Sequence, residues 1–208
     1  MQRSKHDQAG FTIIELLIAT TVFSFFLLLT SSMILQISRT YYKSTLEAKT
    51  QESAREIISE ISQAIQVSDG TVTPISPAFS GGTTSSFCAG SARFTFRPGI
   101  EQFENGTAPD QANHVLVADS VPAGCPTGSL TAFSSNTQRE LMPDRTRLAD
   151  LTVTPLGALG LYTIKVRLVY GDAEVLSNPG LTNAGCAAIR TSQFCAISEL
   201  TTTVQKRL

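Results

Sequence analysis

Residues 11–37 read FTIIELLIATTVFSFFLLLTSSMILQI, and these 27 residues contain one charged side chain, that of Glu15. As an α-helix rising about 1.5 Å per residue, the segment spans roughly 40 Å, which exceeds the bilayer hydrocarbon core of about 30 Å. A secretory signal has a shorter apolar region that ends in a small-residue cleavage site, whereas Ser-Arg-Thr-Tyr-Tyr follows here. We therefore predict a transmembrane helix over residues 11–37.

The helical pattern continues beyond the apolar segment. Neither Gly nor Pro occurs between Phe11 and Asp69. After residue 41, apolar side chains recur three or four positions apart with charged side chains between them, which is typical of an amphipathic helix. The sequence predicts one helix from Phe11 to Val67, within a segment 11–69 that Gly70 ends. Its apolar stripe consists of Ala54, Ile57, Ile58, Ile61 and Ile65.

Residues 70–208 have a different composition, rich in Thr, Ser, Gly and Pro at first and then in short β-like runs. The clearest run is Leu161 to Tyr170, where apolar and polar side chains alternate as in a half-buried antiparallel strand. Further strands are expected over residues 93–96, 114–118, 149–156 and 194–204. We predict an α+β fold in which a meander of short strands packs on the amphipathic half of the helix. The long connection 171–193 needs something to hold it.

The charge and motif content argues against several classes of function. The 208 residues hold 16 Lys and Arg against 17 Asp and Glu, so no net field attracts nucleic acid. Lys206, Arg207 and Arg190 are expected to be solvated rather than to form a nucleic-acid groove. His6 precedes the apolar segment, and the four cysteines lack the C-x₂-C spacing of zinc sites. With no P-loop, dinucleotide or G-x-S-x-G motif, we expect His114 to be structural and the protein to have no enzymatic activity, cofactor or metal.

The stretch GFTIIELLIA at residues 10–19 resembles the N-terminal signature of type IV pilins and type II secretion pseudopilins. The resemblance implies that residues 1–10 are a leader, which a prepilin peptidase removes by cutting between Gly10 and Phe11 on the cytoplasmic side before methylating the new amine. It also implies that Glu15 pairs with the terminal amine of a neighbouring subunit. Physical chemistry supports a partner, because an unpaired carboxylate in lipid costs a few kcal/mol.

The resemblance further implies the partners and location of the chain. They are other pilin or pseudopilin subunits, the prepilin peptidase, the inner-membrane assembly platform and the membrane through residues 11–37. Residues 70–208 would lie outside the cytoplasm, and the subunit would later join a filament. Residues 52–65 resemble the second helical segment of J-type pseudopilins and W-type minor pilins. The absence of Gly and Pro from the apolar segment departs from many major pilins and favours a minor subunit. A major pilin, or a singly anchored extracytoplasmic binding or hydrolytic domain, remains the alternative.

A domain outside the cytoplasm meets oxidising conditions, and its four cysteines allow three pairings. We favour Cys186–Cys195, at the base of the long connection, together with Cys88–Cys125. The first pair resembles the disulfide-delimited C-terminal loop of many pilins. The alternative is four free, buried thiols.

Overall fold

The computed structural model describes residues 11–69, 72–73, 84–103, 113–121, 125–126, 128, 130, 137–157, 160–181, 183–187 and 192–207. The chain divides into two compact units, one up to Tyr41 and one from Tyr42 onwards. Gly10 and Gly70, the predicted cleavage and helix-stop residues, lie outside the described residues.

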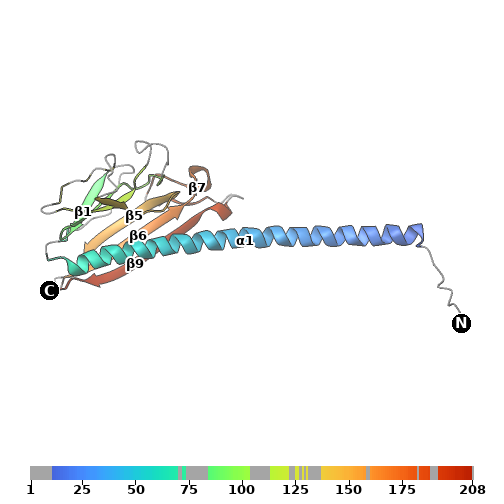
Figure 1. The fold of residues 1–208 in the computed structure, drawn as a ribbon, viewed down its shortest axis with the longest axis horizontal. Coiled ribbons are helices and arrows are strands. Elements are labelled where there is room, and N and C mark those ends of the chain that lie inside the picture. Colours follow the sequence, from blue (N-terminus) through green and yellow to red (C-terminus); the bar gives the residue numbers. More distant parts are fainter. Residues whose placement is uncertain are drawn as a thin grey trace, which may run out of the picture. The chain divides into compact units, whose positions relative to one another are not determined.

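Helix α1 runs without interruption over Ile13–Val67 (Figure 1), which confirms the prediction of one long helix. It begins two residues later than predicted because Thr12 occupies the N-cap position, as described below. At the other end, the Ser68 hydroxyl donates a hydrogen bond of 2.8 Å to the carbonyl oxygen of Ile65. This bond satisfies one of the last-turn carbonyls, which have no partner within a helix.

The predicted apolar stripe of α1 faces the core of the second unit. The buried residues of the helix are Thr50, Ala54, Ile57, Ile61 and Ile65. Ile58 is partly buried and packs against the same core. Since fully burying an Ile side chain stabilises the fold by about 1.5–3 kcal/mol, this stripe is a major source of the unit's stability.

The described strands form three antiparallel sheets. Sheet A has the order β1 (Ser85–Ala89), β2 (Ala92–Phe96), β3 (Leu116–Ser120) and β4 (Gln138–Glu140). Sheet B has the order β5 (Thr146–Pro155), β6 (Leu161–Tyr170) and β9 (Ala196–Gln205). The two-residue strands β7 (Leu176–Ser177) and β8 (Gly185–Cys186) pair with each other, and two short 3₁₀ turns, η2 (Ala173–Val175) and η3 (Ser192–Phe194), flank them.

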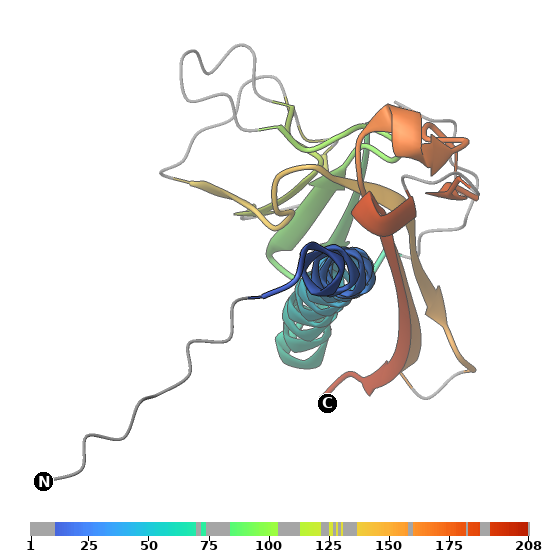
Figure 2. The ribbon, with the colours of Figure 1, turned by 90° about the vertical axis from the view of Figure 1, so that its right-hand side faces the viewer.

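The predicted α+β fold, a long helix packed against antiparallel β-structure, is confirmed, although the strands divide into two main sheets instead of forming one continuous meander. Between β4 and β5 the chain passes Pro143, which has no N–H to donate, and Arg145, which adopts a φ of 60°. This turn ends the pairing of sheet A before β5 begins. Figure 2 shows α1 with the green strands of sheet A on one side and the red strand β9 on the other.

The apolar face of sheet B follows the predicted alternation in β6. Ile164, Val166 and Leu168 are buried, whereas Lys165 and Arg167 between them are half-buried on the opposite face. On that outer face, the Lys165 ammonium lies 3.3 Å from a carboxylate oxygen of Asp150 and 3.2 Å from one of Glu199. The outer face of the sheet is thus a polar surface with its own ion pairs.

Strand β3 begins at Leu116 rather than at His114 as predicted. The reason is the Glu140 carboxylate of β4, which accepts hydrogen bonds from the backbone N–H groups of Val115 at 3.1 Å and Leu116 at 3.0 Å. A further bond of 3.0 Å comes from the N–H of Met142. The Nδ1 atom of His114 lies 3.3 Å from Glu140 Oε2. At the start of β3, the Glu140 side chain thus accepts hydrogen bonds that a neighbouring strand would otherwise accept.

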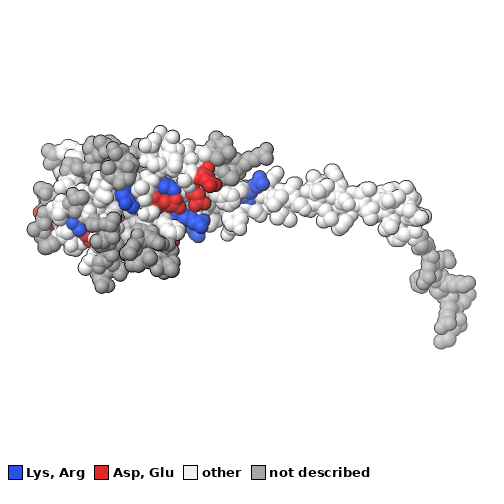
Figure 3. All heavy atoms as spheres, turned by 90° about the horizontal axis from the view of Figure 1, so that it is seen from above, with Lys and Arg blue, Asp and Glu red and all other residues white. Residues whose placement is uncertain are grey.

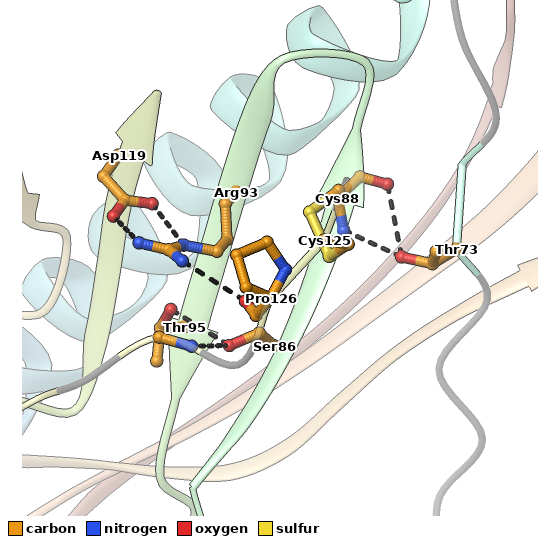
Figure 4. The surroundings of a disulfide bond; sticks show 9 residues. Thr73, Ser86, Cys88, Arg93, Thr95, Asp119, Cys125 and Pro126 are labelled. Atoms are coloured by element: carbon orange, nitrogen blue, oxygen red, sulfur yellow. Dashed lines mark hydrogen bonds and ion pairs between the residues drawn. A yellow bond between two sulfur atoms is a disulfide. The ribbon is translucent and has the colours of Figure 1, made fainter. Parts of the chain in front are cut away.

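A disulfide joins Cys88 of β1 to Cys125 (Figure 4). Two hydrogen bonds hold the segment that follows Cys125 against the sheet. The guanidinium of Arg93 donates to the carbonyl oxygen of Pro126 at 3.2 Å, and the N–H of Gly128 donates to the Ser86 hydroxyl at 2.9 Å. The same guanidinium makes a bidentate contact with Asp119 on β3.

A second disulfide, Cys186–Cys195, closes the end of the long connection between β6 and β9. The connection also folds back on sheet B, because the Arg167 guanidinium donates a 3.0 Å hydrogen bond to the carbonyl oxygen of Ala184. A small apolar cluster of Ala149, Val169, Leu176, Ala184 and Cys195 lies beneath it. The disulfide, the Arg167 hydrogen bond and the apolar cluster hold the described part of this long connection against sheet B.

We expect the two disulfides to differ in their effect on stability. The Cys88–Cys125 bridge spans 37 residues and the Cys186–Cys195 bridge spans 9. In the chain-entropy model, removing them by paired Ser substitutions lowers the free energy of unfolding by about 4 and about 3 kcal/mol, respectively. Urea unfolding of the detergent-solubilised full chain measures the losses. Thiol counting is the check on the pairing, because four reactive thiols in the oxidised protein would contradict it.

Candidate functional site

The first turn of α1 is closed by a reciprocal pair of hydrogen bonds between Thr12 and Glu15. The backbone N–H of Thr12 donates to Glu15 Oε2 at 2.9 Å, and the N–H of Glu15 donates to the Thr12 hydroxyl oxygen at 3.3 Å. The Thr12 hydroxyl itself donates to Glu15 Oε2 at 2.7 Å. This arrangement is a capping box. A Thr-x-x-Glu pattern directly before an apolar run is the sequence signature of this motif, and residues 12–15 have it.

The capping box matters more in an apolar environment than in water. In lipid or in a bundle of apolar helices, no water is present to satisfy the free N–H groups of a first turn. Glu15 accepts one of these bonds, and its negative charge lies at the positive end of the helix dipole. Its carboxylate is thereby held at the backbone N–H of Thr12, the residue after Phe11.

The segment between Phe11 and Ile37 presents an uncovered apolar surface. Its large apolar side chains are exposed, with Phe11 at 84%, Leu28 at 72% and Ile37 at 67%. On the face drawn in Figure 3, no Lys, Arg, Asp or Glu interrupts this segment. Among the described residues, α1 is the helix with the length and composition to cross a membrane. A continuous apolar surface of this size needs lipid or other apolar helices to cover it.

Most hydroxyl groups within this segment hydrogen-bond to its own backbone. Ser24 donates to the carbonyl oxygen of Thr20 at 2.7 Å, four residues earlier, and Ser32 donates to that of Leu29 at 2.8 Å, three residues earlier. The same bonds are made by Thr20, Thr21 and Thr30. These five hydroxyl groups can therefore enter a dry environment with their hydrogen bonds made, and the helix stays unbroken through the segment.

The structure places the sequence-predicted site residues in two separate groups. Phe11 and Glu15 lie at the start of α1 in the first unit, whereas the paired cysteines Cys88–Cys125 and Cys186–Cys195 lie in the second. The cysteines support the fold of the second unit and take no part in the N-terminal group. Within the part of the chain that the structure describes, no group of three or more His, Cys, Asp or Glu side chains could hold a metal ion.

Comparison with known proteins found a match in the same N-terminal region. Residues 5–31 match the sequence family described as the prokaryotic N-terminal methylation motif. The matched region includes the Gly10–Phe11 junction, Glu15 and most of the apolar segment. Searches of curated proteins and of solved structures found no match to the chain. The motif supports a type IV pilin-like or pseudopilin-like subunit, and together with the apolar helix it fits anchoring in a membrane.

Proposed function

We propose that this chain is a minor, non-enzymatic subunit of a type IV pilus or of a type II secretion pseudopilus, which helps to initiate or cap the filament. The observation that carries the proposal is the methylation motif over residues 5–31, continuous with a helix whose apolar side chains are exposed. A polymerisation element requires both features, namely a processed terminus and a surface that neighbouring helices can cover.

The proposed mechanism is assembly. The prepilin peptidase cuts between Gly10 and Phe11, which leaves a positively charged, methylated amine at Phe11. The assembly platform in the inner membrane then moves the helix from lipid into a bundle of neighbouring helices. Because lipid tails and apolar side chains are similar environments, the transfer costs little free energy. The Glu15 carboxylate pairs with the amine of the adjacent subunit, and this pair sets how far one subunit is displaced along the next.

The unbroken apolar helix supports the assignment to a minor subunit. Hydroxyl side chains at Ser24 and Ser32 hydrogen-bond to the preceding turn instead of interrupting the helix. Quantitative mass spectrometry of purified filaments tests this point, since an initiating or capping subunit should be present at a few per cent or less of the main subunit. A ratio near one would identify a major pilin instead.

Processing gives the most direct test of the proposed function. In cells with a prepilin peptidase, the mature protein should lack residues 1–10 and carry one additional methyl group, because the peptidase both cuts and methylates. Intact-mass spectrometry of membrane-extracted protein measures both changes. The matched control is Gly10→Val, which should keep the full-length mass. An unprocessed wild-type chain beside a processed known pilin would contradict the proposal.

A further inference from the structure

Strand β9 is an edge strand of sheet B, and within the described ranges its outer side has no strand partner. In an antiparallel pair, alternate residues direct their backbone N–H and C=O groups toward the partner strand. The N–H of Lys206 donates to the carbonyl oxygen of Gly160 at 2.9 Å, which fixes this alternation for β9 and β6. The backbone groups that face away from β6 therefore belong to Ile197, Glu199, Thr201, Thr203 and Gln205. All five residues are exposed.

The opposite edge of sheet B, strand β5, is closed. Its first half accepts backbone hydrogen bonds from another segment of the chain. The N–H of Gly99 donates to the carbonyl oxygen of Leu148 at 2.9 Å, and the N–H of Gln102 donates to that of Thr146 at 2.8 Å. The last residue of β5 is Pro155, which has no N–H to offer to a further strand. Covering an edge or ending it in Pro prevents unwanted pairing with other chains.

Strand β9 has none of these protections. Its sequence, AISELTTTVQ, contains no Pro, Gly or Lys and is rich in β-branched residues, which favour strand pairing. Its one charged side chain, Glu199, lies over the sheet, where its carboxylate is 3.2 Å from Lys165 and 3.5 Å from Arg167 of β6. A groove of about 490 Å³, lined by Gln66 of α1 and residues 203–207, leaves room beside the end of the strand. A ten-residue edge left open in this way is a template for another strand.

We propose that an extended segment of a different filament subunit adds to β9 as a further strand of sheet B. Its backbone pairs with the five outward-facing residues of β9. At the start of this edge, the exposed side chains of Phe194 and Ile197 offer an apolar contact, so the incoming segment carries a large apolar side chain at that end. The inference rests on the proposed function, because an initiating or capping subunit must bind subunits of another kind.

A second copy of this chain fits the edge less well than a different subunit does. Figure 1 shows β9 running in the same direction as the second half of α1, and the N–H of Arg207 donates to the carbonyl oxygen of Gln66 at 3.2 Å where both elements end. Antiparallel pairing of two β9 edges would therefore set the two helices in opposite directions, whereas the proposed filament needs them in the same direction. Parallel pairing would keep the direction, but it is less stable per residue.

Proline substitution on the outward side of β9 tests the contact. Thr201→Pro removes an N–H that faces away from β6, so the bonds between β6 and β9 remain and the urea midpoint of the full chain should stay near the wild-type value. The matched control, Thr201→Val, keeps the N–H and the β-branched shape. We expect Thr201→Pro to lower the ratio of subunit in sheared filaments to subunit in the membrane by about tenfold or more, and Thr201→Val to leave it unchanged. Wild-type incorporation of Thr201→Pro would overturn the inference.

Photo-cross-linking of the full-length chain identifies the occupant without a proline in the strand. A benzophenone amino acid replaces Thr203 on the outward side of β9, and the control carries it at Thr154 of β5, which is also exposed. We expect about tenfold more product from position 203, joined to an extended segment of another subunit that itself has an N-terminal methylation motif. A product made of two copies of this chain, or equal yields at both positions, would overturn the inference.

The processing of the wild-type chain in the same cells separates the two proposals. If the chain loses residues 1–10 and enters filaments but gives no such cross-link, only the contact at β9 is refuted. If it is neither processed nor incorporated, the proposed function fails as well.

Discussion

Glu15→Val is expected to lower the incorporation of this subunit into filaments at least about tenfold while leaving its insertion into the membrane intact. In the proposed filament the Phe11 amine of one subunit lies in an apolar bundle, and Glu15 supplies its counter-charge. Removing one partner of a buried ion pair costs about 3–5 kcal/mol, because the other charge remains without compensation. Membrane insertion should not suffer, since Val is more favourable than Glu within an apolar segment.

The measurement is the ratio of subunit in sheared filaments to subunit in the membrane fraction, determined by quantitative immunoblotting. Glu15→Gln separates charge from capping, because its amide oxygen can still accept the hydrogen bonds of Thr12 but carries no charge. Thr12→Val removes the hydroxyl of the capping box, and Thr12→Ser restores it. We expect Glu15→Gln to fail like Glu15→Val, and Thr12→Val to have a smaller effect. Wild-type incorporation of Glu15→Gln would show that the charge is not required.

Local sequence patterns were sufficient to predict the helix and the longest strand. An apolar run of 27 residues followed by a 3.6-residue period leaves few alternatives to α1, and the buried residues Ala54, Ile57 and Ile61 follow that period. Strand β6 (Leu161–Tyr170) has the predicted bounds, because the alternation of apolar and polar side chains from Tyr162 to Leu168 is a strong signal of a half-buried strand.

The strands that sequence analysis missed depend on partners far away in the chain. Strand β1 reads SSFCA and shows no regular alternation, yet it pairs with β2, where the Phe87 ring stacks on Phe94 at a centroid distance of 4.8 Å. Strand β4 reads QRE, three polar residues that give no sequence signal of a strand. It is a strand because it pairs with β3, and no local pattern encodes such a pairing. The division into two sheets was missed for the same reason.

The candidate site was predictable in its residues but not in its geometry. The motif at residues 10–19 singled out Phe11 and Glu15. The prediction gave Glu15 a partner in another subunit and did not include Thr12, which is the N-cap of α1 and accepts the hydrogen bond of the Glu15 N–H. The structure adds a partner within the chain, and the two roles make different demands on Glu15. A hydrogen-bond acceptor suffices for the capping box, whereas pairing with an amine requires a charge.

The buried carboxyl of Glu140 is expected to make the stability of the second unit fall as the pH rises from about 5 to 7. Its side chain is 14% exposed. Burial raises the pKa of Glu140 from 4.5 to about 7, although bonds from the backbone N–H groups of Leu116, Met142 and Val115 oppose the shift. The unfolded chain ionises near pH 4.5, and the folded chain only near pH 7. Folding therefore takes up a proton between these values, and the stabilisation is complete below pH 4.5.

The size of this effect follows from the shift in pKa. A difference of about 2.5 units between the folded and unfolded states corresponds to roughly 3 kcal/mol of stability lost across the interval. Urea unfolding of the detergent-solubilised full chain at pH 5, 6, 7 and 8 measures the slope. Glu140→Gln should be less stable at pH 5, because its side-chain amide has one acceptor oxygen, whereas both oxygens of the Glu140 carboxyl group lie within hydrogen-bond distance of the three backbone N–H groups. The same variant should lose the pH dependence that Glu140 contributes.

The imidazole of His114 faces this carboxyl, with Nδ1 3.3 Å from Oε2, so the contribution of this second ionisable side chain must be separated from that of Glu140. His114→Gln removes the imidazole and leaves the backbone N–H groups that donate to the Glu140 carboxyl unchanged. If Glu140 is responsible, His114→Gln should keep most of the decline in stability between pH 5 and 7, whereas Glu140→Gln should abolish it. A wild-type slope in Glu140→Gln would mean that the carboxyl is already ionised throughout this range, held in that state by the N–H groups of Val115, Leu116 and Met142.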